Sequence, residues 1–549
     1  MSVPFIDMDR DDDDGVGYVS ESHYLKSPSV EQQQAMSLLQ IPQGVPRESS
    51  ISSNMSDMDV PIYSSENLTT RSRKVVHSGF NGRLAFAIAA SALGSSFQHG
   101  YNTGVLNNPQ KILEQWINST MQQRSGGEVP TSEGIIFIFS LMVSVFCVGG
   151  MIGGAVTGLV AERFGRKGGL LINNLLVLLA VICMSSSKSA ASYELIILGR
   201  FLIGVNSGLN AGLAPMYLAE ISPVNLRGAV GTVYQLVITI SILIAQIVSL
   251  RSVLGTENHW PTLLALTIIP AVFQIVTLPF CPESPKYLLL SKGKELEAQK
   301  SLSWLRGTLA VHDEMDGMRA EAEAMKLVPR VTMRELITNS ALRIPLIIAL
   351  TVMVAQQLSG INAVMFFSSQ IFQMAGLTDD SATYATLGMG GINVLMTIVS
   401  LFLVEKAGRK TLLLIGFAGM TIDTTLLTIS MLLADKAQAL KVMCVIFVLI
   451  YVIMFASGPG SIPWFLVSEL FNQSARPTAS SLAVCINWTA NFLVGLAFLP
   501  LANAMGPYVF IIFIVLQFLF LLFIHYKVPE TKNKTLEEIS AMFRAQSYQ

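Results

Sequence analysis

The feature that most constrains the fold is a series of long apolar runs between Gly82 and Lys527. Each run is about 20 residues long or longer, which is the length that an α-helix needs to cross the hydrocarbon core of a bilayer. Helices satisfy all their backbone hydrogen bonds within one segment, so they are the favoured way to span a membrane. The sequence predicts twelve spanning helices, near residues 82–106, 135–161, 168–188, 193–217, 229–252, 262–281, 344–374, 382–404, 411–433, 441–467, 478–502 and 506–527.

The charge of the chain also favours a polytopic membrane protein over a soluble one. Only 13% of the residues are charged, whereas about 25% is typical of soluble domains. The net charge is −1, so there is no basic field to attract nucleic acid, and we expect no nucleic-acid partner. The five cysteines lie in or beside apolar segments, which favours buried thiols over a disulfide framework.

The apolar runs and the charged segments divide the chain into five parts. The first residues are rich in Ser, Gln and Asp and show no apolar periodicity, which predicts a disordered cytosolic tail that is either regulatory or an inert spacer. A charged insert with helix-length patterns separates the sixth run from the seventh. The predicted parts are a tail (1–80), an N-terminal six-helix half (81–281), a cytosolic helical linker (282–343), a C-terminal six-helix half (344–527) and a cytosolic C-terminal tail (528–549).

The two halves repeat each other. AERFGRK before Gly168 reappears as VEKAGRK before Thr411, AEISPVNLRG as SELFNQSARP, and PESPK as PETKN. The three pairs occur in the same order at offsets between 243 and 249 residues. If the N-terminus is placed in the cytosol, the short loops on the cytosolic side hold more Lys and Arg than the loops on the outer side. This asymmetry predicts an even number of spans with both termini in the cytosol. The repeat is typical of the parallel halves of major facilitator transporters.

The repeated motifs predict a charge cluster at the cytosolic end of each half. Glu220 and Glu469 each precede an arginine by seven residues, and one carboxylate there can hold two basic groups of its half together. Two interpretations stay open: a gate that locks the halves together while the cytosolic side is closed, and a static staple. We favour the gate because both halves carry the same set. Its expected members are Arg166, Glu220, Arg227, Arg409, Glu469 and Arg476.

A second pattern is a stripe of uncharged amides inside the apolar helices. Amides at membrane depth are costly unless they are paired, so they should face a cavity or a neighbouring helix. An amide both donates and accepts hydrogen bonds, as a sugar hydroxyl does, whereas a cation would require carboxylates and an anion would require Lys or Arg. Any single amide can instead bond two helices, but together they favour a cavity for a neutral polyol. The stripe comprises Gln235, Gln246, Gln356, Gln357, Asn362, Asn393, Asn487 and Asn491.

Breakers and aromatic residues accompany the stripe. The sequence GPGSIPW, ending at Trp464, interrupts the tenth helix and permits a bend. We expect Trp464 and Trp488 to stack on the apolar face of a pyranose. Asp423 is the only acid deep in a span. For Asp423 we favour a paired or protonated structural role over a proton carrier.

The chain resembles the facilitative glucose transporter family, in the sugar porter branch of the major facilitator superfamily. The matching motifs include GYNTGV, RFGRK, LGRFLIGV, PMYLAEISPVNLRG, PESPK, QQLSGINAV, VEKAGRK, GPGSIPWF, NWTANF and VPETK, in order between about residues 80 and 540. The resemblance implies an all-α membrane protein of twelve transmembrane helices. It also implies that Asn118, in the first outer loop, is N-glycosylated. The sugar-contacting residues that it implies are Gln235, Ile238, Ile242, Gln356, Gln357, Asn362, Asn393, Trp464, Asn487 and Trp488.

Several positions depart from the family pattern. Ala456 stands where the family often has a glutamate before the GPG of the tenth helix, so one hydrogen-bonding carboxylate is missing. Phe366 and Phe367 replace a pair of tyrosines. The residues before QQLSG read Met-Val-Ala where glucose-selective members often read Gln-Leu-Ser. These departures leave fructose open as an additional substrate.

We therefore expect a uniporter of a hexose, foremost D-glucose, in the plasma membrane, without a cofactor, a metal or enzymatic activity. It should act as a monomer in the lipid bilayer, with regulatory partners for the N-terminal tail. The nearest alternative is a proton–sugar symporter, but Asn102 stands where that branch carries an acid in the first helix. A non-transporting sugar sensor, which would signal through the long tail, is the alternative from another class.

Overall fold

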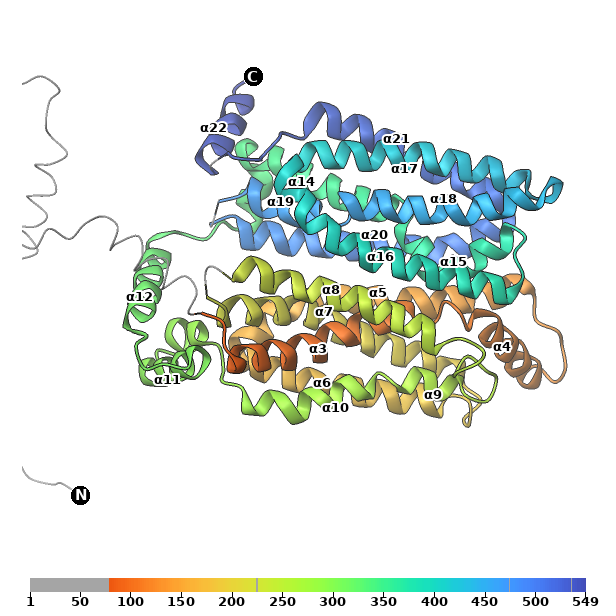
Figure 1. Cartoon of the computed structure of the whole chain (residues 1–549), viewed down its shortest axis with the longest axis horizontal. Coiled ribbons are helices and arrows are strands. Elements are labelled where there is room, and N and C mark those ends of the chain that lie inside the picture. The colour runs from red at the N-terminus through yellow and green to blue at the C-terminus, as the bar shows by residue number, and fades with distance from the viewer. Residues whose placement is uncertain (1–78, 224–225, 473, 535) are drawn as a thin grey trace, which may run out of the picture. The chain divides into compact units, whose positions relative to one another are not determined.

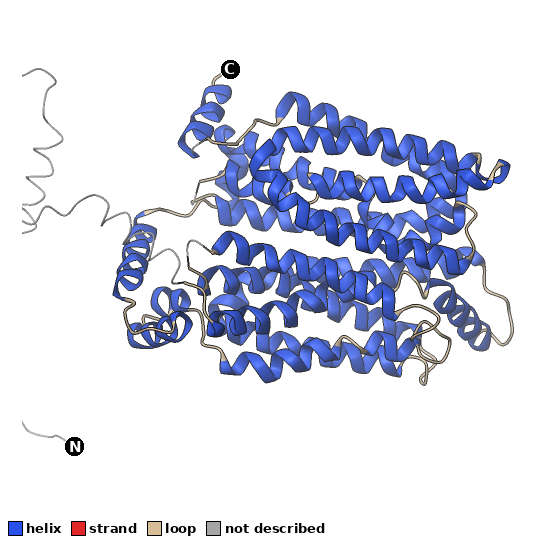
Figure 2. Cartoon of the chain, in the orientation of Figure 1, coloured by secondary structure: helices blue, strands red, loops and turns tan. Residues whose placement is uncertain are grey.

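The computed structural model describes residues 79–549, apart from 224–225, 473 and 535. Every regular element in these residues is a helix, and none of them lies in a β-strand (Figure 2). The predicted N-terminal tail falls outside the described residues except for Gly79 and Phe80, so its role stays a prediction.

The first half contributes six spanning segments (Figure 1). Asn81 caps the first of them by accepting hydrogen bonds from two backbone N–H groups. The sixth segment is broken into two short helices followed by a 3-10 turn. The elements are α3 (Gly82–Gly104), α5 (Ser132–Phe164), α6 (Arg166–Ser186), α7 (Tyr193–Ile221), α8 (Arg227–Val248), α9 (Trp260–Ala265), α10 (Ile268–Thr277) and η2 (Leu278–Phe280).

The second half repeats this arrangement, and two of its segments are interrupted. The last helix, α22, lies outside the spans and buries Ile539 and Phe543 against the rest of the half. The elements are α14 (Ser340–Leu358), α15 (Ile361–Met374), α16 (Asp379–Ala407), α17 (Arg409–Leu432), η4 (Ala434–Lys436), α18 (Gln438–Ser457), α19 (Ile462–Leu470), α20 (Arg476–Met505), η5 (Gly506–Tyr508), α21 (Val509–Lys527) and α22 (Leu536–Ser547).

The predicted number of spans is confirmed. Ten stretches of the described residues are long and apolar enough to cross a membrane, and one of these, Arg476–Lys527, holds both α20 and α21. α3 adds a further segment of 23 residues that is rich in small and polar side chains. The result is twelve segments in two six-helix halves, with a helical insert between them.

Small residues bring α5 and α7 into backbone contact. Gly149 and Gly153 lie one turn apart on α5 and face Gly204 and Gly208 on α7. A Cβ atom at Gly153 would lie 2.2 Å from the carbonyl oxygen of Val205, and one at Gly204 would lie 2.2 Å from the carbonyl oxygen of Phe146. Paired small residues with this spacing are a common device for close helix packing in membranes, where apolar burial gives little driving force. This close contact between α5 and α7 therefore determines how these two helices of the first half pack together.

The structure differs from the sequence-based expectation between the first two spans. The segment expected to be a loop contains a 15-residue helix, α4 (Gln110–Arg124). Leu113 and Ile117, one turn apart, are fully buried, and the ring of Trp116 lies 4.9 Å from that of Trp260. α4 is thus an amphipathic helix that packs on the end of the first half, and Asn118 lies on a helix rather than in a loop.

The insert between the halves consists of η3 (Tyr287–Ser291, a π-helical turn), α11 (Glu295–Arg306), α12 (His312–Leu327) and α13 (Met333–Thr338). Its first part is fixed to the first half. The Asn81 side chain donates a hydrogen bond to the carbonyl of Leu305 (2.8 Å), and Arg306 donates one to the carbonyl of Ile221 (2.8 Å).

The last part of the insert is fixed to the other half. The N–H of Val331 donates to the carbonyl of Ser474 (3.1 Å), and the hydroxyl of Thr478 donates to the carbonyl of Val331 (2.8 Å). We call the end of the bundle that carries α11, α12 and α13 the linker end, and the opposite end, with α4, the α4 end (Figure 1).

Polar contacts join the two halves at the α4 end. Asn107, which follows α3, donates to the hydroxyl of Ser368 (2.5 Å) and accepts from the N–H of Ser369 (3.1 Å) on α15. Asp379, at the start of α16, pairs with both Lys111 (2.5 Å) and Arg251 (3.4 Å) of the first half. Among the described residues, the ion pairs at the linker end stay within one half or within the insert. The halves are therefore held together at the α4 end in this structure.

We expect Asp379→Asn to favour separation of the halves at the α4 end. Both ion pairs are solvent-exposed, and an exposed pair contributes about 0.2–1 kcal/mol, so the loss of two pairs should shift the equilibrium toward separated halves by about two- to thirtyfold. Hydrogen–deuterium exchange should accelerate by that factor at the backbone amides of residues 366–372. Asp380→Asn is the matched control, because no ion pair of Asp380 occurs among the described residues. Equal exchange in the two variants would contradict the role of Asp379.

Candidate functional site

Four amide side chains meet where α14 ends. Ser359 and Gly360 separate α14 from α15, and Gly360 has φ = +100°, which glycine adopts readily. The Gln357 amide donates to Asn487 Oδ1 (3.1 Å), and the Asn487 amide donates to Gln356 Oε1 (2.8 Å). Asn362 donates to Gln357 Oε1. We call Gln356, Gln357, Asn362 and Asn487 the amide cluster.

The amide cluster is attached to a second helix break. α18 ends at Ser457 and α19 begins at Ile462, with the GPGS segment between them. The Gln356 amide donates to the carbonyls of Pro459 (3.1 Å) and Gly460 (2.7 Å) in this segment. Backbone groups freed by a break need partners inside a membrane, and Gln356 supplies one. Trp464, on the first turn of α19, is 43% exposed and so is accessible rather than packed in the core.

The remaining predicted contact residues lie on other helices. On α8, Gln235 is exposed, whereas Ile238 and Ile242 are buried in the core of the first half. Asn393 on α16 is buried at 8% exposure. Trp488 on α20 is also buried, and a Cβ at Gly150 of α5 would lie 2.7 Å from its ring, so Trp488 packs across the interface between the halves. The structure thus brings four of the ten predicted residues into one hydrogen-bonded cluster, and the other six lie outside it, on α8, α16, α19 and α20.

Two further amides of the predicted stripe have no such role. Gln246 is fully buried on α8, and neither of its side-chain polar atoms has a partner among the described residues. Asn491 Oδ1 is likewise buried without a partner in the described part of the chain. The carboxyl oxygen Oδ2 of Asp423 is buried too, and no residue that the structure describes pairs with it.

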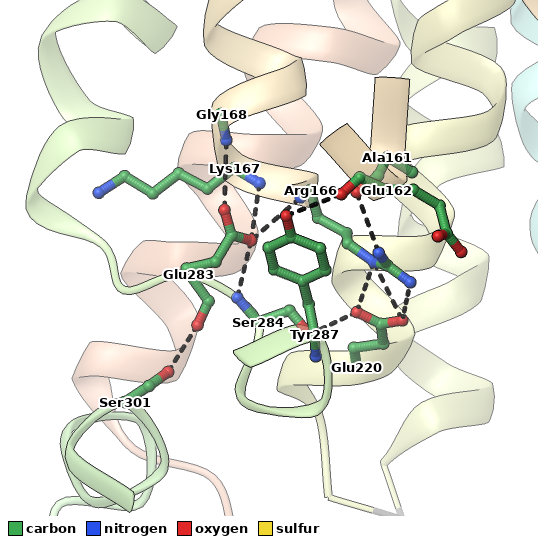
Figure 3. A network of polar contacts seen from close by, with 10 residues as sticks. All are labelled: Ala161, Glu162, Arg166, Lys167, Gly168, Glu220, Glu283, Ser284, Tyr287 and Ser301. Atoms are coloured by element: carbon green, nitrogen blue, oxygen red, sulfur yellow. Dashed lines mark hydrogen bonds and ion pairs between the residues drawn. The ribbon is translucent and has the colours of Figure 1, made fainter. Parts of the chain in front are cut away.

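The charge cluster of the first half forms a tight network at the linker end (Figure 3). Arg166 pairs with Glu220 (3.0 Å), and the hydroxyl of Ser284 also donates to Glu220. Glu283 accepts hydrogen bonds from the backbone N–H groups of Arg166 (3.1 Å) and Lys167 (3.0 Å) at the start of α6. Its negative charge there pairs with otherwise free N–H groups and interacts favourably with the helix dipole. The turn before α6 is sharp: Gly165 has φ = +80°.

The second half repeats this network. Arg409 pairs with Glu469 (2.9 Å), Thr531 donates to Glu469, and Glu530 accepts the N–H of Arg409 (3.0 Å) at the start of α17. Burial raises the pKa of the Glu530 carboxyl, but hydrogen bonds from backbone N–H groups at the start of α17 and at Lys532 outweigh burial and hold this pKa below its ordinary value.

One part of the charge-cluster prediction is wrong. Arg476 does not join Arg409 on Glu469: its guanidinium donates to the carbonyl of Phe471 (3.2 Å), and its Nε is buried without a partner among the described residues. Arg476 begins α20 directly after a turn, and this turn directs the guanidinium back to Phe471. Arg227 begins α8, and its side chain is outside the described part of the structure.

Sequence reasoning missed a buried amide network in the first half. Gln98 on α3 donates to Asn174 on α6 (3.0 Å) and accepts from Asn206 on α7 (3.0 Å). Asn174 donates to Gln274 on α10 (3.0 Å). The signal that could have revealed it is the same one that revealed the amide stripe, namely amides inside apolar helices. This network links α3, α6, α7 and α10 of one half and so rigidifies that half.

Comparison with known proteins places this architecture in a family. Residues 87–543 match the family model described as "Sugar (and other) transporter". Solute carrier family 2, facilitated glucose transporter member 3 of Mus musculus is 48% identical over 466 residues, which cover 85% of this chain and 94% of that protein. Member 1 of Gallus gallus is 45% identical over 468 residues, with coverage of 85% and 94%.

Solved structures show the same fold. The xylose transporter XylE from E. coli, in a partially occluded inward open conformation, matches with a TM-score of 0.70 at 25% identity and covers 83% of this chain and 100% of its own. XylE described as a proton:xylose symporter bound to 6-bromo-6-deoxy-D-glucose matches with a TM-score of 0.67 at 25% identity, covering 84% and 99%. The chain therefore belongs to the facilitative glucose transporter family, within the sugar transporters of the major facilitator superfamily.

Proposed function

We propose that the chain is a uniporter that carries a hexose, foremost D-glucose, across the plasma membrane by alternating access, down the concentration gradient. The observation that carries the proposal is the amide cluster, where two helix breaks and α20 meet without any charged group among its members. Amides match the mixed donors and acceptors of a sugar and repel neither sign of charge. The names of the relatives, facilitated glucose transporters, support this substrate class.

The proposed contact residues extend from the amide cluster to both halves. Gln235, Ile238 and Ile242 supply the α8 side, and Asn393, Trp464 and Trp488 complete the site. Trp464 is accessible, and an indole ring offers both an apolar face and an N–H donor to a pyranose. Fructose stays open as an additional substrate.

Uniport is favoured over proton symport by the surroundings of Asn102. Its amide donates to the carbonyl of Gln98 (2.8 Å) and to Thr267 (3.0 Å) and does not titrate. The buried guanidinium of Arg200 binds the carbonyl of Asn102 (2.6 Å), and no ion pair of Arg200 occurs among the described residues. α17, which carries Asp423, packs against α18 and α21 of its own half, so we assign Asp423 a structural role.

The orientation follows from the basic residues at the linker end. Arg166 and Lys167 begin α6, and Arg409 and Lys410 begin α17, directly after short turns at this end, which favours the cytosol for this end and for both termini. Asn118 then faces outside on α4, as an N-glycosylation site requires.

The two charge networks at the linker end are proposed to gate that side, while the contacts of Asp379 close the α4 end. A carrier that works by alternating access needs one state open at the linker end and one open at the α4 end, with similar free energies.

The test is uptake of labelled glucose by the purified chain in liposomes. Uniport predicts saturable uptake that an uncoupler leaves unchanged, and addition of sugar should move no protons inward. Unlabelled fructose as a competitor reports the hexose range. Uptake that collapses with the uncoupler would instead establish symport. If liposomes with the chain take up no hexose beyond empty ones, the transport proposal is wrong.

A further inference from the structure

A histidine lies between the two halves beside the proposed site. His99 on α3 faces Trp488 on α20, with ring centroids 6.0 Å apart and planes inclined by 28°. The rings of Phe146 and Tyr234 lie 6.4 Å and 6.5 Å from it. Trp488 directly follows Asn487 of the amide cluster. His99 is thus a polar ring among aromatic groups from both halves, next to residues that we propose to contact sugar.

The position of His99 is fixed by the contact of α3 with α8. A Cβ at Gly100 would lie 2.3 Å from the carbonyl oxygen of Ile238 and would overlap the hydroxyl of Ser241, so the two helix backbones touch at this point. One ring nitrogen of His99, Nδ1, shares a hydrogen bond with the hydroxyl of Tyr234 (3.3 Å). Rotation of the imidazole ring would therefore break the hydrogen bond between Nδ1 and the Tyr234 hydroxyl.

The second ring nitrogen, Nε2, makes no hydrogen bond with any described residue. It is not one of the fully buried unpartnered polar atoms among the described residues, so it stays accessible. A phenyl ring would fill the same aromatic surroundings without a polar atom, whereas the accessible Nε2 can form a hydrogen bond with a ligand hydroxyl. If the Tyr234 hydroxyl donates to Nδ1, Nε2 carries the proton and donates to a ligand. If Nδ1 donates to Tyr234, Nε2 accepts from a ligand.

We propose that His99 is a specificity-determining residue of the sugar site: its Nε2 forms a hydrogen bond with one hydroxyl of the bound hexose. This inference rests on the proposed hexose transport. It assigns to the first half a direct polar contact with substrate, opposite the amide cluster of the second half. The bond would hold the sugar against both halves at once.

The test uses glucose analogues that each lack one hydroxyl, in competition with labelled glucose. In the wild-type chain, the analogue that lacks the bonded hydroxyl should bind at least about fivefold more weakly than glucose, as expected for loss of one such hydrogen bond. In His99→Phe this penalty should disappear, while the penalties at the other positions stay unchanged. The fluoro analogue at the same position should bind well if Nε2 donates and poorly if it accepts, because fluorine cannot donate.

Two amide variants separate hydrogen bonding from packing. The amide of His99→Gln reaches the place of Nε2, whereas that of His99→Asn reaches only the place of Nδ1. The penalty at the bonded position should therefore persist in His99→Gln and vanish in His99→Asn, and neither side chain titrates. Equal analogue profiles in the wild type and in every transporting variant would overturn the inference and leave hexose transport intact. Absence of hexose uptake by the wild-type chain would instead refute the proposed function itself.

Discussion

Gln357→Leu is expected to reduce hexose uptake at least about tenfold while the protein still reaches the cell surface. Leucine has a similar volume, but it removes the hydrogen bonds of Gln357 to Asn487 and Asn362. Asn487 Oδ1 and the Asn362 amide N–H then lose their partner in the amide cluster. Each buried polar group left unpaired costs about 1–3 kcal/mol, and the proposed site loses a donor and an acceptor for the sugar. The measurement is initial uptake of labelled glucose, normalised to surface protein.

Gln246→Leu is the matched control for this variant. Gln246 is another buried amide of the predicted stripe, but neither of its side-chain polar atoms has a partner among the described residues. Removing an unpaired amide should be neutral or stabilising, so uptake should stay near that of the wild type. Normal uptake in Gln357→Leu, or an equal loss in both variants, would refute the special role of the amide cluster.

Gly153→Val is expected to prevent correct folding of the first half. Its side chain would enter the backbone of α7 at Val205, where the contact already leaves no room for a Cβ. Overpacking commonly costs about 1–3 kcal/mol when side chains can adjust, and backbone atoms of two interlocked helices adjust less. We expect the monodisperse peak in fluorescence-detected size-exclusion chromatography to be lost in favour of aggregate.

Gly158→Val tests whether the site, rather than the substitution, is responsible. Gly158 lies on the same helix and is exposed, and a Cβ added there would meet no atom within 4 Å. This variant should elute as the wild type does. A monodisperse Gly153→Val protein with unchanged thermal stability would show that α5 and α7 tolerate separation. The first half would then fold without their close contact.

Sequence hydropathy predicts the spans well because each span is a single long apolar run. The end of α5 at Phe164 and the start of α6 at Arg166 even follow from the glycine between them. The same reasoning fails for α4, whose apolar face rests on only a few residues such as Leu113 and Ile117, because a search for membrane-length runs passes over a short amphipathic helix. The helical spacing of α4 is present in the sequence, but the helix is shorter and less apolar than the runs for which the sequence was searched.

For the site, residue types are predictable and partners are not. Gln356 is conspicuous as an amide in an apolar helix, but its bonds to the carbonyls of Pro459 and Gly460 depend on how two distant helix breaks meet. The pairing of Arg409 with Glu469 follows from the repeat, whereas Arg476 turns away because of the local geometry before α20. The free Nε2 of His99 is visible only once the rings around it are placed.

The division of the insert between the two halves sets a tether length. α12 ends at Leu327 on the side of the first half, and Val331 is anchored to the second half by its own backbone. A fully extended chain spans at most about 3.3–3.6 Å per residue, so these two points can separate by no more than about 14 Å while both anchors hold. While the hydrogen bonds of Val331 hold, the covalent chain thus limits how far these two points can move apart when the linker end opens. The segment from Leu327 to Val331 thus limits how far the two halves can move apart at the linker end during transport.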